Sequence, residues 1–328
     1  MRKKIKGLKL IVVLLSVFMG IMSFAPASVY AANSREVFNK ISFSLVFNPF
    51  SSLLKLGKSN SSSKTTNSNT SSKNDKDTKY SGKTISKNNI VYKNTSSKKC
   101  VYDVKYVDDG NLKPIIIAVH GGTWRSGNKS GMNSLVDYFV PMGYVVANVE
   151  YEMLSNGNYI TGQISEVMEA VKAIASAASD YQGDRSRIAI AGMSSGAQVA
   201  VRVVQQVVSG EYDFNIKAIL DFCGYCDMSY MRMPNYYSYM IDGRRNVDFL
   251  KEVKKIDPMR YITSSMPPTL VMHSSSDNVV PIGNAESFYN ALIRGNVKAQ
   301  FLKTSGVGHG IFMNKYGTAA KDFLSKYV

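Results

Sequence analysis

The sequence is poor in the residues that usually carry acid–base, metal and redox chemistry. Its 328 residues include three histidines, three cysteines and one tryptophan. Histidine is the most frequent general base in enzymes, so only three positions offer an imidazole for that role. The cysteines Cys100, Cys223 and Cys226 are too few for a small disulfide-stapled scaffold. Hydrophobic residues make up 45% of the chain, which is enough for a conventional apolar core.

Cys223 and Cys226 are separated by two residues, a spacing shared by zinc sites and redox pairs. A zinc site needs two further ligands, and the neighbouring sequence supplies none. A redox role is disfavoured because the pair does not open a helix in a thioredoxin-like unit. A local disulfide and two free thiols both remain open. We expect neither a metal nor another cofactor.

Acidic residues are scarce in the N-terminal part of the chain. Residues 1–99 hold 18 Lys/Arg and 3 Asp/Glu, a balance of +15. The remaining residues hold 22 and 21, a balance of +1, so nearly all of the net charge of +16 lies before residue 100. A protein that binds nucleic acid through its folded domain carries its basic surface there. The charge distribution therefore argues against nucleic acid as a partner.

No apolar run reaches the ~20 residues that a membrane-spanning helix needs. A mostly apolar run of 15 residues, 10–24, follows five basic residues and precedes Ala-Pro-Ala-Ser-Val-Tyr-Ala-Ala. This layout is typical of a secretory signal peptide. We expect residues 1–32 to be a signal peptide, cleaved after Ala31 or Ala32, and the protein to be secreted. A retained membrane anchor is the alternative.

Residues 33–87 are dominated, from 57 onward, by Ser, Asn, Thr, Lys and Gly. Such a composition cannot bury enough apolar area to offset the entropy of ordering, so we predict a disordered tail and linker. Residues 32–99 carry 13 Lys/Arg against 3 Asp/Glu, or +10. On an exported protein this tail is suited to electrostatic association with the cell wall or a membrane surface. A solubilising spacer is an equal alternative.

Beyond residue 88, strand-like and helical patterns alternate to the end of the chain. Continuous apolar runs indicate strands buried on both faces. We expect a folded domain over 88–328, with an α/β architecture, a mostly parallel sheet of about eight strands, and helices on both faces. The expected strands are 90–92, 100–107, 114–119, 144–149, 187–191, 216–222, 269–272 and 298–302. The expected helices are 131–141, 162–179, 197–208, 247–255, 283–294 and 314–327.

Residues 223–267 interrupt the alternation and are rich in tyrosine and methionine. We expect this segment to form a small cap or rim beside the sheet. Aromatic and thioether side chains suit contact with an aryl group, an acyl group or a sugar ring. Packing against the sheet is the simpler role for most of them.

The pentapeptide Gly192-Met193-Ser194-Ser195-Gly196 stands where an apolar strand-like run meets a helical one. In such a turn the central serine adopts a strained backbone conformation. Its second neighbour on each side must then be glycine or another very small residue. Gly192 and Gly196 meet this condition, so we predict that Ser194 is a nucleophile. An ordinary glycine-rich turn is the alternative.

A serine hydroxyl is a weak nucleophile at neutral pH, so this prediction requires a general base and an acid that orients it. His120 and His273 stand at strand ends, whereas His309 lies in a glycine-rich loop after the last expected strand. His309 alone follows both Ser194 and a candidate acid in the chain order Ser, Asp, His of one class of serine hydrolases. We predict that His309 is the base; an exposed loop histidine is the alternative.

The candidate acid is Asp277, just beyond the carboxyl end of an expected strand, where catalytic groups of parallel sheets gather. Asp221 and Asp227 compete for this role, but we interpret both as carboxylates that cap a helix or stabilise a turn. We interpret His273 as a structural residue, hydrogen-bonded within the turn that presents Asp277.

Residues 120–124, His-Gly-Gly-Thr-Trp, follow the third expected strand. Glycines let the backbone approach a tetrahedral intermediate closely. We therefore predict an oxyanion hole formed by the backbone N–H groups of Gly122, Thr123 and Ser195. A phosphate-binding loop is the rival interpretation, but neither of the usual glycine-rich phosphate motifs is present here.

Residues 120–129, 182–188 and 192–196 resemble, in this order, motifs of the bacterial α/β-hydrolase carboxylesterases related to the hormone-sensitive-lipase and feruloyl-esterase-like groups. The resemblance covers about residues 88–328. It implies an α/β-hydrolase fold and serine-dependent hydrolysis of small esters without a metal. Kynurenine formamidases share the His-Gly-Gly-x-Trp pattern.

The chain departs from the usual residues of this family at three places. Residues 151–153 read Tyr-Glu-Met where Tyr-Arg-Leu is frequent, Ser195 replaces an alanine, and Glu166 stands near the position of an aspartate. None of these departures removes a predicted catalytic residue, but they bear on the subfamily.

Together these features predict a secreted serine carboxylic ester hydrolase that acts on small acyl or aryl esters through an acyl-enzyme. Trp124, Tyr225 and Tyr236 are the expected substrate-binding residues. The expected partner is a small ester molecule, and the oligomeric state stays open. An arylformamidase-type amidase and a catalytically silent hydrolase-fold binding protein are the alternatives.

Overall fold

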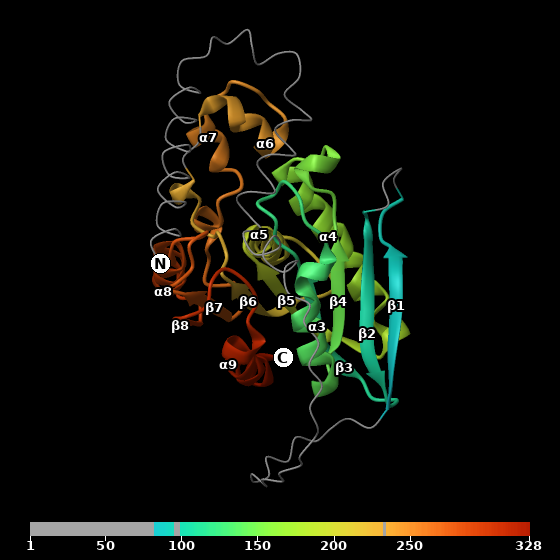
Figure 1. Cartoon of the computed structure of the whole chain (residues 1–328). Helices are drawn as coiled ribbons and strands as arrows, with labels where there is room; N and C mark the ends of the chain where they lie inside the picture. The colour runs from blue at the N-terminus through green and yellow to red at the C-terminus, as the bar shows by residue number, and fades with distance from the viewer. Residues whose placement is uncertain (1–81, 95–98, 232–233) are drawn as a thin grey trace, which may run out of the picture. The chain divides into compact units, whose positions relative to one another are not determined.

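The computed structural model of the chain describes residues 82–94, 99–231 and 234–328 (Figure 1). The predicted signal peptide, residues 1–32, and most of the predicted tail, residues 33–81, lie outside the described residues. Secretion, the linker and the association of the tail therefore stay predictions. Within the part of the chain that the structure describes, no helix combines the length and the apolar character needed to cross a bilayer.

Eight strands form one sheet in the order β1-β2-β4-β3-β5-β6-β7-β8. The pairs β1–β2 and β2–β4 are antiparallel, and all other pairs are parallel. The predicted α/β fold with a mostly parallel central sheet is confirmed. The strands are β1 Lys83–Val91, β2 Val101–Asp108, β3 Lys113–Val119, β4 Val145–Glu150, β5 Gly183–Met193, β6 Ile216–Phe222, β7 Thr269–Ser274 and β8 Ala299–Thr304.

Helices cover both faces of the sheet, as predicted (Figure 1). One apolar cluster joins the sheet to α4, α5 and α8, and a second joins its other face to α3 and α9. The α-helices of the described residues are α3 Asn133–Phe139, α4 Ile160–Ser176, α5 Ser195–Ser209, α6 Tyr239–Asp242, α7 Phe249–Val253, α8 Ile282–Arg294 and α9 Met313–Tyr327.

From Pro114 to Val119, strand β3 is apolar at every position rather than at alternate ones, and its surroundings show why. Ile115, Ile117 and Val119 belong to the cluster shared with α4 and α5. Ile116 and Ala118 belong to the cluster shared with α3 and α9. Successive side chains of a strand point to opposite faces, so a strand covered by helices on both sides must be apolar throughout.

The sheet begins earlier in the chain than the sequence predicted. β1 starts at Lys83, inside the segment that was expected to be a linker up to residue 87. It is an edge strand whose side chains are mostly exposed, and it is paired with β2, with Lys83 opposite Asp108. Amino-acid composition indicates how much apolar side-chain area a segment can bury. It could not reveal a polar edge strand that is held by backbone hydrogen bonds.

The described residues of the 223–267 segment form short helices between β6 and β7. Figure 1 shows α6 and α7 next to each other beyond one end of the sheet. Many apolar side chains of the segment are buried in the same cluster as those of α4 and α5, so packing is their main role. They include Met228, Met231, Met240, Ile241, Phe249 and Val253.

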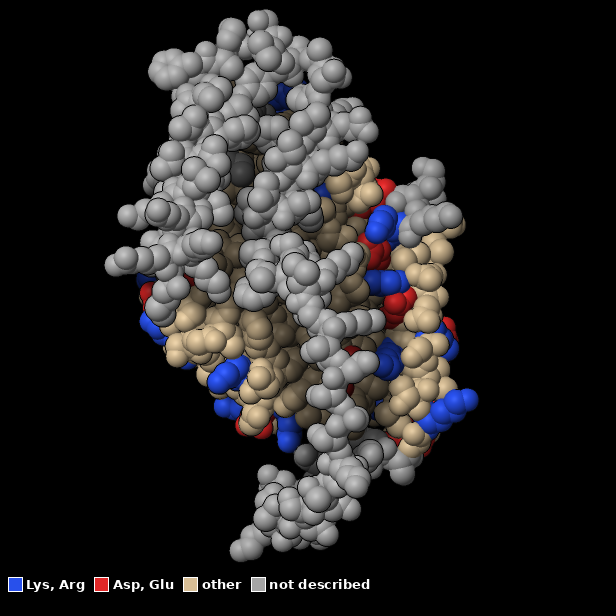
Figure 2. All heavy atoms as spheres, viewed as in Figure 1, with Lys and Arg blue, Asp and Glu red and all other residues tan. Residues whose placement is uncertain are grey.

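Charged side chains of both signs are interspersed on the face shown in Figure 2. Beside β1 and β2 they form ion pairs, such as Lys129 Nζ with Asp103 Oδ1 at 2.6 Å and Lys105 Nζ with Asp137 Oδ1 at 3.0 Å. The described residues that are visible in this view present no large patch of one sign. The positive charge of the chain lies mainly in residues outside the description.

Candidate active site

Ser194 occupies the turn between β5 and α5, with φ 56° and ψ −126°. Such a conformation costs a non-glycine residue about 1–3 kcal/mol, so the surrounding structure must hold it in place. Hydrogen bonds do so on both sides: the Ser194 N–H donates to Phe222 O at 3.0 Å, and Ser194 O accepts from Ala197 N at 3.1 Å. The strand, sharp turn and helix that the sequence predicted are all present.

The glycines around Ser194 are required by close contacts between backbone segments. A Cβ atom on Gly192 would lie 2.4 Å from Ala197 Cα, and one on Gly196 would lie 2.2 Å from His120 O. A Cβ on Gly121 would lie 2.9 Å from Ser194 Cβ. The serine turn and the loop after β3 thus meet at a distance that only glycine permits.

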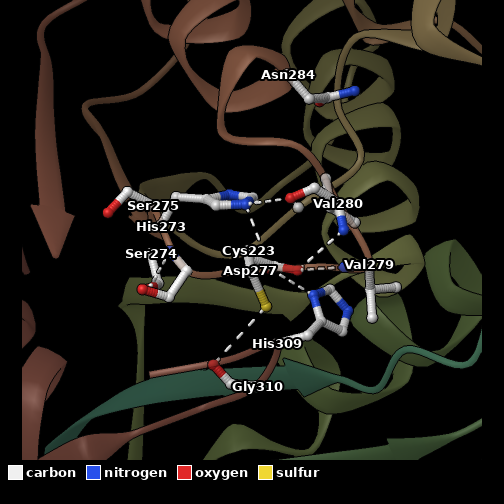
Figure 3. Close-up of polar contacts among 12 residues, drawn as sticks. Cys223, His273, Ser274, Ser275, Asp277, Val279, Val280, Asn284, His309 and Gly310 are labelled. Atoms are coloured by element: carbon white, nitrogen blue, oxygen red, sulfur yellow. Dashed lines mark hydrogen bonds and ion pairs between the residues drawn. The ribbon is translucent and has the colours of Figure 1, made fainter. Parts of the chain in front are cut away.

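Asp277 and His309 form a hydrogen-bonded pair on the loops that follow β7 and β8 (Figure 3). His309 Nδ1 lies 2.7 Å from Asp277 Oδ2. The Asp277 side chain is fully buried, while that of His309 is 13% exposed. The other carboxylate oxygen, Oδ1, accepts from the backbone N–H groups of Val279 and Val280 at 2.8 and 2.9 Å. The sequence predicted this pairing from chain order.

His273 supports the same carboxylate from the end of β7. Its Nε2 lies 2.9 Å from Val280 O and 3.3 Å from Asp277 Oδ2 (Figure 3). Because a carbonyl oxygen only accepts, Nε2 must carry the proton. The ring is completely buried, and it fastens the turn that presents Asp277. This is the structural role that the sequence predicted.

These contacts explain the low pKa of the Asp277 carboxyl. Burial alone would raise the pKa of the Asp277 carboxyl, but hydrogen bonds from His273, His309 and two backbone N–H groups outweigh it and hold that pKa well below its usual range. Burial would likewise lower the pKa of His273, but the Asp277 carboxylate and the Val280 carbonyl raise it. Asp277 is therefore a carboxylate at any pH near neutral.

Cys223 connects the serine turn with the His309 loop. It follows Phe222, whose carbonyl accepts from the Ser194 N–H, and its own backbone has φ 44°. The Cys223 thiol lies 3.7 Å from Gly310 O, next to His309 in the chain. Ser194, Asp277 and His309 therefore belong to neighbouring loops at the carboxyl ends of the parallel strands.

The loop after β3 turns back through three residues with positive φ: Gly122 at 135°, Thr123 at 55° and Trp124 at 58°. Among the described residues, the backbone N–H groups of Gly122, Thr123 and Ser195 donate to no recorded hydrogen bond partner. The Ser195 N–H is also the first of α5, where the helix dipole is positive. These three predicted donors are thus available to an anionic oxygen.

Trp124 anchors this loop inside the protein. Its indole N–H donates to Gln198 Oε1 at 2.8 Å, and its carbonyl accepts from Gln163 Nε2 at 2.8 Å. The two glutamines were not singled out in the sequence. Their signal was a polar residue on the buried face of a helix, since both are fully buried. The side chain of Trp124 is 5% exposed, and its contact with substrate stays a prediction.

Tyr225 stands edge-on against Trp124, with ring centroids 5.7 Å apart. It is half-buried, and its N–H lies 3.3 Å from Ser194 O, so it adjoins the serine turn. The side chain of Tyr236, the third residue expected to bind substrate, lies outside the description. Tyr225 is therefore a residue expected to bind substrate that the structure places beside the serine turn.

Two departures from the usual family residues have structural partners. Ser195 Oγ accepts from the Trp124 N–H at 3.2 Å, so it ties the serine turn to the loop after β3. Glu166 Oε2 accepts from the Glu152 N–H at 3.0 Å, and its Oε1 pairs with Lys93 at 3.1 Å. Both side chains stabilise loops at the same edge of the sheet.

The competing aspartates have the roles that the sequence suggested. Asp227 caps a short 3₁₀ helix by accepting from the Ser229 N–H at 2.9 Å. Asp221 accepts from the Gly224 N–H at 2.8 Å and faces the Cys226 thiol at 3.7 Å. Burial raises the pKa of the Asp221 carboxyl to about 6, against the opposing effects of His273 and these two contacts.

Two groups of side chains within the described residues have donor atoms close enough to share a metal ion. One consists of Cys223, Asp277 and His309, and the other of Cys100, Glu152 and Glu166. Cys223 and Cys226 are both free thiols, so of the two possibilities left open by the sequence, a local disulfide and two free thiols, the structure has the second.

Comparisons with known proteins agree with this geometry. A family model described as BD-FAE matches residues 101–292. Esterase LipC from Mycobacterium tuberculosis is 25% identical over 214 residues, which cover 60% of this chain and 53% of that protein. The isoprenylcysteine alpha-carbonyl methylesterase ICME from Arabidopsis thaliana is 25% identical over 237 residues, 66% of this chain and 55% of its own length. The chain thus spans about half the length of these relatives.

The fold also matches solved structures. A truncated form of a carbohydrate esterase from gut microbiota superposes with a TM-score of 0.64. The match has 24% sequence identity and covers 77% of this chain and 98% of that one. At this identity the comparison establishes the fold.

The raised pKa of the Asp221 carboxyl predicts that the stability of the protein depends on pH. Its carboxyl has an ordinary pKa of 3.8 in an unfolded chain, but burial raises this pKa to about 6 in the folded protein. The folded state therefore holds an extra proton between these values. We expect its contribution to the free energy of unfolding to fall by up to about 3 kcal/mol as the pH rises from about 4 to 6. Urea unfolding at a series of pH values measures this decline.

The variant Asp221→Asn keeps an acceptor for the Gly224 N–H but cannot ionise, so its stability should decline less over the same pH range. Asp213→Asn, which changes a largely exposed carboxylate, is the matched control and should follow the wild type. Equal declines in Asp221→Asn and the wild type would contradict the assignment.

Proposed function

The chain belongs to the BD-FAE family and has the α/β-hydrolase fold, and we propose that it is a serine carboxylic ester hydrolase. One observation carries the proposal: the hydrogen bond of 2.7 Å between His309 and the buried Asp277, on a loop that neighbours the strained Ser194 turn. A buried carboxylate that holds an imidazole by Nδ1 leaves Nε2 as a base for a serine hydroxyl. The names of the relatives, an esterase and a methylesterase, support the same chemistry.

The proposed reaction has two stages. Ser194 Oγ attacks the ester carbonyl carbon, and His309 Nε2 takes the hydroxyl proton. His309 then gives this proton to the departing alcohol, which leaves an acyl group on Ser194. A water molecule, deprotonated by His309, attacks the acyl carbon and releases the carboxylic acid. Asp277 stays ionised throughout and stabilises the imidazolium.

The backbone N–H groups of Gly122, Thr123 and Ser195 would hold the oxygen that becomes negative in each tetrahedral intermediate. They need no rearrangement to do so, since the positive φ angles and the Ser195–Trp124 hydrogen bond already fix the loop. Fixed donors are effective because their orientation costs no energy during the reaction; one donor is worth about 3 kcal/mol.

The proposed substrates are small acyl or aryl esters. Tyr225, half-buried beside the serine turn and braced by Trp124, provides an aromatic wall for an acyl or aryl group. The names of the similar proteins mention a methyl ester and carbohydrate esters, so the alcohol differs among them. We leave the alcohol of this chain's substrate to a panel of acetyl, butyryl, methyl ferulate and acetylated-xylan substrates.

We also propose that the enzyme acts outside the cell. The support is the sequence of residues 1–32, with its basic start, apolar run and small residues near Ala31. The basic residues that follow would then hold the enzyme close to anionic polymers or lipid headgroups.

We expect Ser194→Ala to lower the rate of p-nitrophenyl acetate hydrolysis by at least about 10⁴-fold, because the neighbouring Ser195 hydroxyl is held by the Trp124 N–H and does not replace the nucleophile. Steady-state kinetics measure this loss, and the unfolding midpoint should stay close to that of the wild type. Ser209→Ala, at the exposed end of α5, is the control and should retain full activity.

A fluorophosphonate probe separates this enzyme from a silent binding protein. The wild type should be labelled on Ser194 and the Ser194→Ala variant should not. Full activity in Ser194→Ala would overturn the assignment, and a preference for N-formylkynurenine over all esters would favour the amidase.

We expect His273 to act as a positioning residue through Asp277. His273→Phe fills the space but removes the N–H that lies 3.3 Å from the carboxylate. Loss of a hydrogen bond to a charged group costs about 1.5–3 kcal/mol, so kcat/KM should fall about tenfold or more. The loss should appear in kcat and leave KM unchanged, because His273 contacts the Asp277 carboxylate and is not one of the proposed substrate contacts.

His273→Gln retains an N–H donor and should keep kcat near that of the wild type. A merely structural role predicts a lower Tm in both variants with no loss of kcat.

Secretion is tested by expressing the full chain in a bacterial host that exports proteins and sequencing the N-terminus of the secreted form. We expect the mature chain to begin at Ala32 or Asn33, since small residues at this position suit signal peptidase. Protein that keeps its first residues and stays with the cells would support the retained anchor instead.

A further inference from the structure

A third reactive side chain stands beside the proposed acid and base. The Cys223 sulfur, a carboxylate oxygen of Asp277 and a ring nitrogen of His309 all lie within 4.8 Å of one another. Figure 3 shows the sulfur next to the His309 ring, on the side of Gly310. The proposed hydrolysis uses no thiol, so the Cys223 sulfur has no role in that reaction.

The three donors suit one class of ion. Thiolate sulfur, imidazole nitrogen and carboxylate oxygen are the ligands that Zn²⁺ takes in proteins, usually in tetrahedral geometry. Three protein ligands leave the fourth position for water or another small ligand. Donor atoms spread over less than 5 Å need only small side-chain movements to reach bonds of about 2.0–2.3 Å.

The local charge also favours a cation here. Among the described residues, the ion-pair partners of Asp277 are the imidazoles of His273 and His309, with no lysine or arginine. Burial raises the pKa of the Cys223 thiol, and the carboxylates of Asp277 and Asp221 raise it further. The negative charge that opposes a bare thiolate would stabilise a bound metal, and a bound metal makes the thiol lose its proton.

The second group of possible metal ligands is less suited to bind an ion. In the group of Cys100, Glu152 and Glu166, the Glu166 carboxylate already pairs with Lys93 Nζ at 3.1 Å and accepts from the Glu152 N–H at 3.0 Å. A divalent ion there would have to displace an existing cation. The cluster at Cys223 imposes no such cost.

We propose that Cys223, His309 and Asp277 form an inhibitory binding site for a thiophilic divalent cation, of which Zn²⁺ is the type. Binding releases one proton, from the thiol, while the imidazole stays neutral and uses a lone pair. The ion binds the His309 imidazole and the Asp277 carboxylate, so His309 cannot act as the base and hydrolysis stops until the ion leaves. The His309 ring, at 13% exposure, is the side from which solvent reaches the cluster. The inhibition rests on the proposed function; the binding site does not.

The test compares Zn²⁺ inhibition of p-nitrophenyl acetate hydrolysis in the wild type, Cys223→Ala and Cys226→Ala, each relative to its own rate without metal. We expect inhibition of the wild type, reversed by a chelator, with kcat falling while KM is unchanged. Loss of a ligand should raise the inhibition constant of Cys223→Ala at least about 100-fold. Cys226→Ala is the matched control and should behave like the wild type, because its thiol faces Asp221 instead.

Cobalt(II) provides a readout that needs no activity. The wild type and Cys226→Ala should show thiolate-to-cobalt charge-transfer absorption, and Cys223→Ala should not. If cobalt produces this absorption but no ester is hydrolysed, the site stands and the proposed function fails. If esters are hydrolysed without the absorption, or if Zn²⁺ inhibits all three proteins equally, the metal site is overturned.

Discussion

The strained backbone of Ser194 is the constraint around which this edge of the protein is built. A serine at φ 56° and ψ −126° persists only where neighbouring segments leave it no alternative. At three positions, Gly192, Gly196 and Gly121, the backbone approaches so closely that an added Cβ atom would collide with backbone atoms. The glycines follow from that contact. The Ser195 Oγ accepts from the Trp124 N–H at 3.2 Å, which also joins the turn to the loop after β3.

Asp277 organises the charge at the site. Its two oxygens receive contacts from two imidazoles and two backbone N–H groups, which is why a fully buried carboxyl remains ionised. Asp221, also buried, lacks such a set of donors, and burial raises its pKa to about 6. The contrast shows that hydrogen bonds, and not depth in the protein, decide which aspartate can serve a histidine. The ionised Asp277 carboxylate would also stabilise a cation bound beside Cys223.

Three polar side chains stabilise the loop that follows the carboxyl end of β3. Ser195 and the buried glutamines Gln163 and Gln198 all bond to Trp124, so an indole that is 5% exposed holds the loop of the proposed oxyanion donors. The family match covers residues 101–292 and therefore includes this loop and Asp277 but not His309. The base is assigned from chain order and from its bond to Asp277.

The sequence by itself predicted the sheet and the three candidate catalytic residues. Continuous apolar runs predicted the parallel strands, because a strand covered on both faces is apolar on both, as β3 is from Pro114 to Val119. The rarity of histidine reduced the choice of base to His309, and Asp277 was preferred because Asp221 and Asp227 were interpreted as cap or turn carboxylates. These inferences depend on local pattern and chain order, which a sequence contains.

Only the tertiary structure decided the rest. The start of β1 at Lys83 depends on backbone pairing with β2, which side-chain composition does not report. The pKa of Asp221, the support of Asp277 by His273, and the place of Cys223 beside His309 arise between residues far apart in the chain. Burial and hydrogen bonding are properties of the assembled environment, so a residue's type and neighbours in sequence cannot fix them.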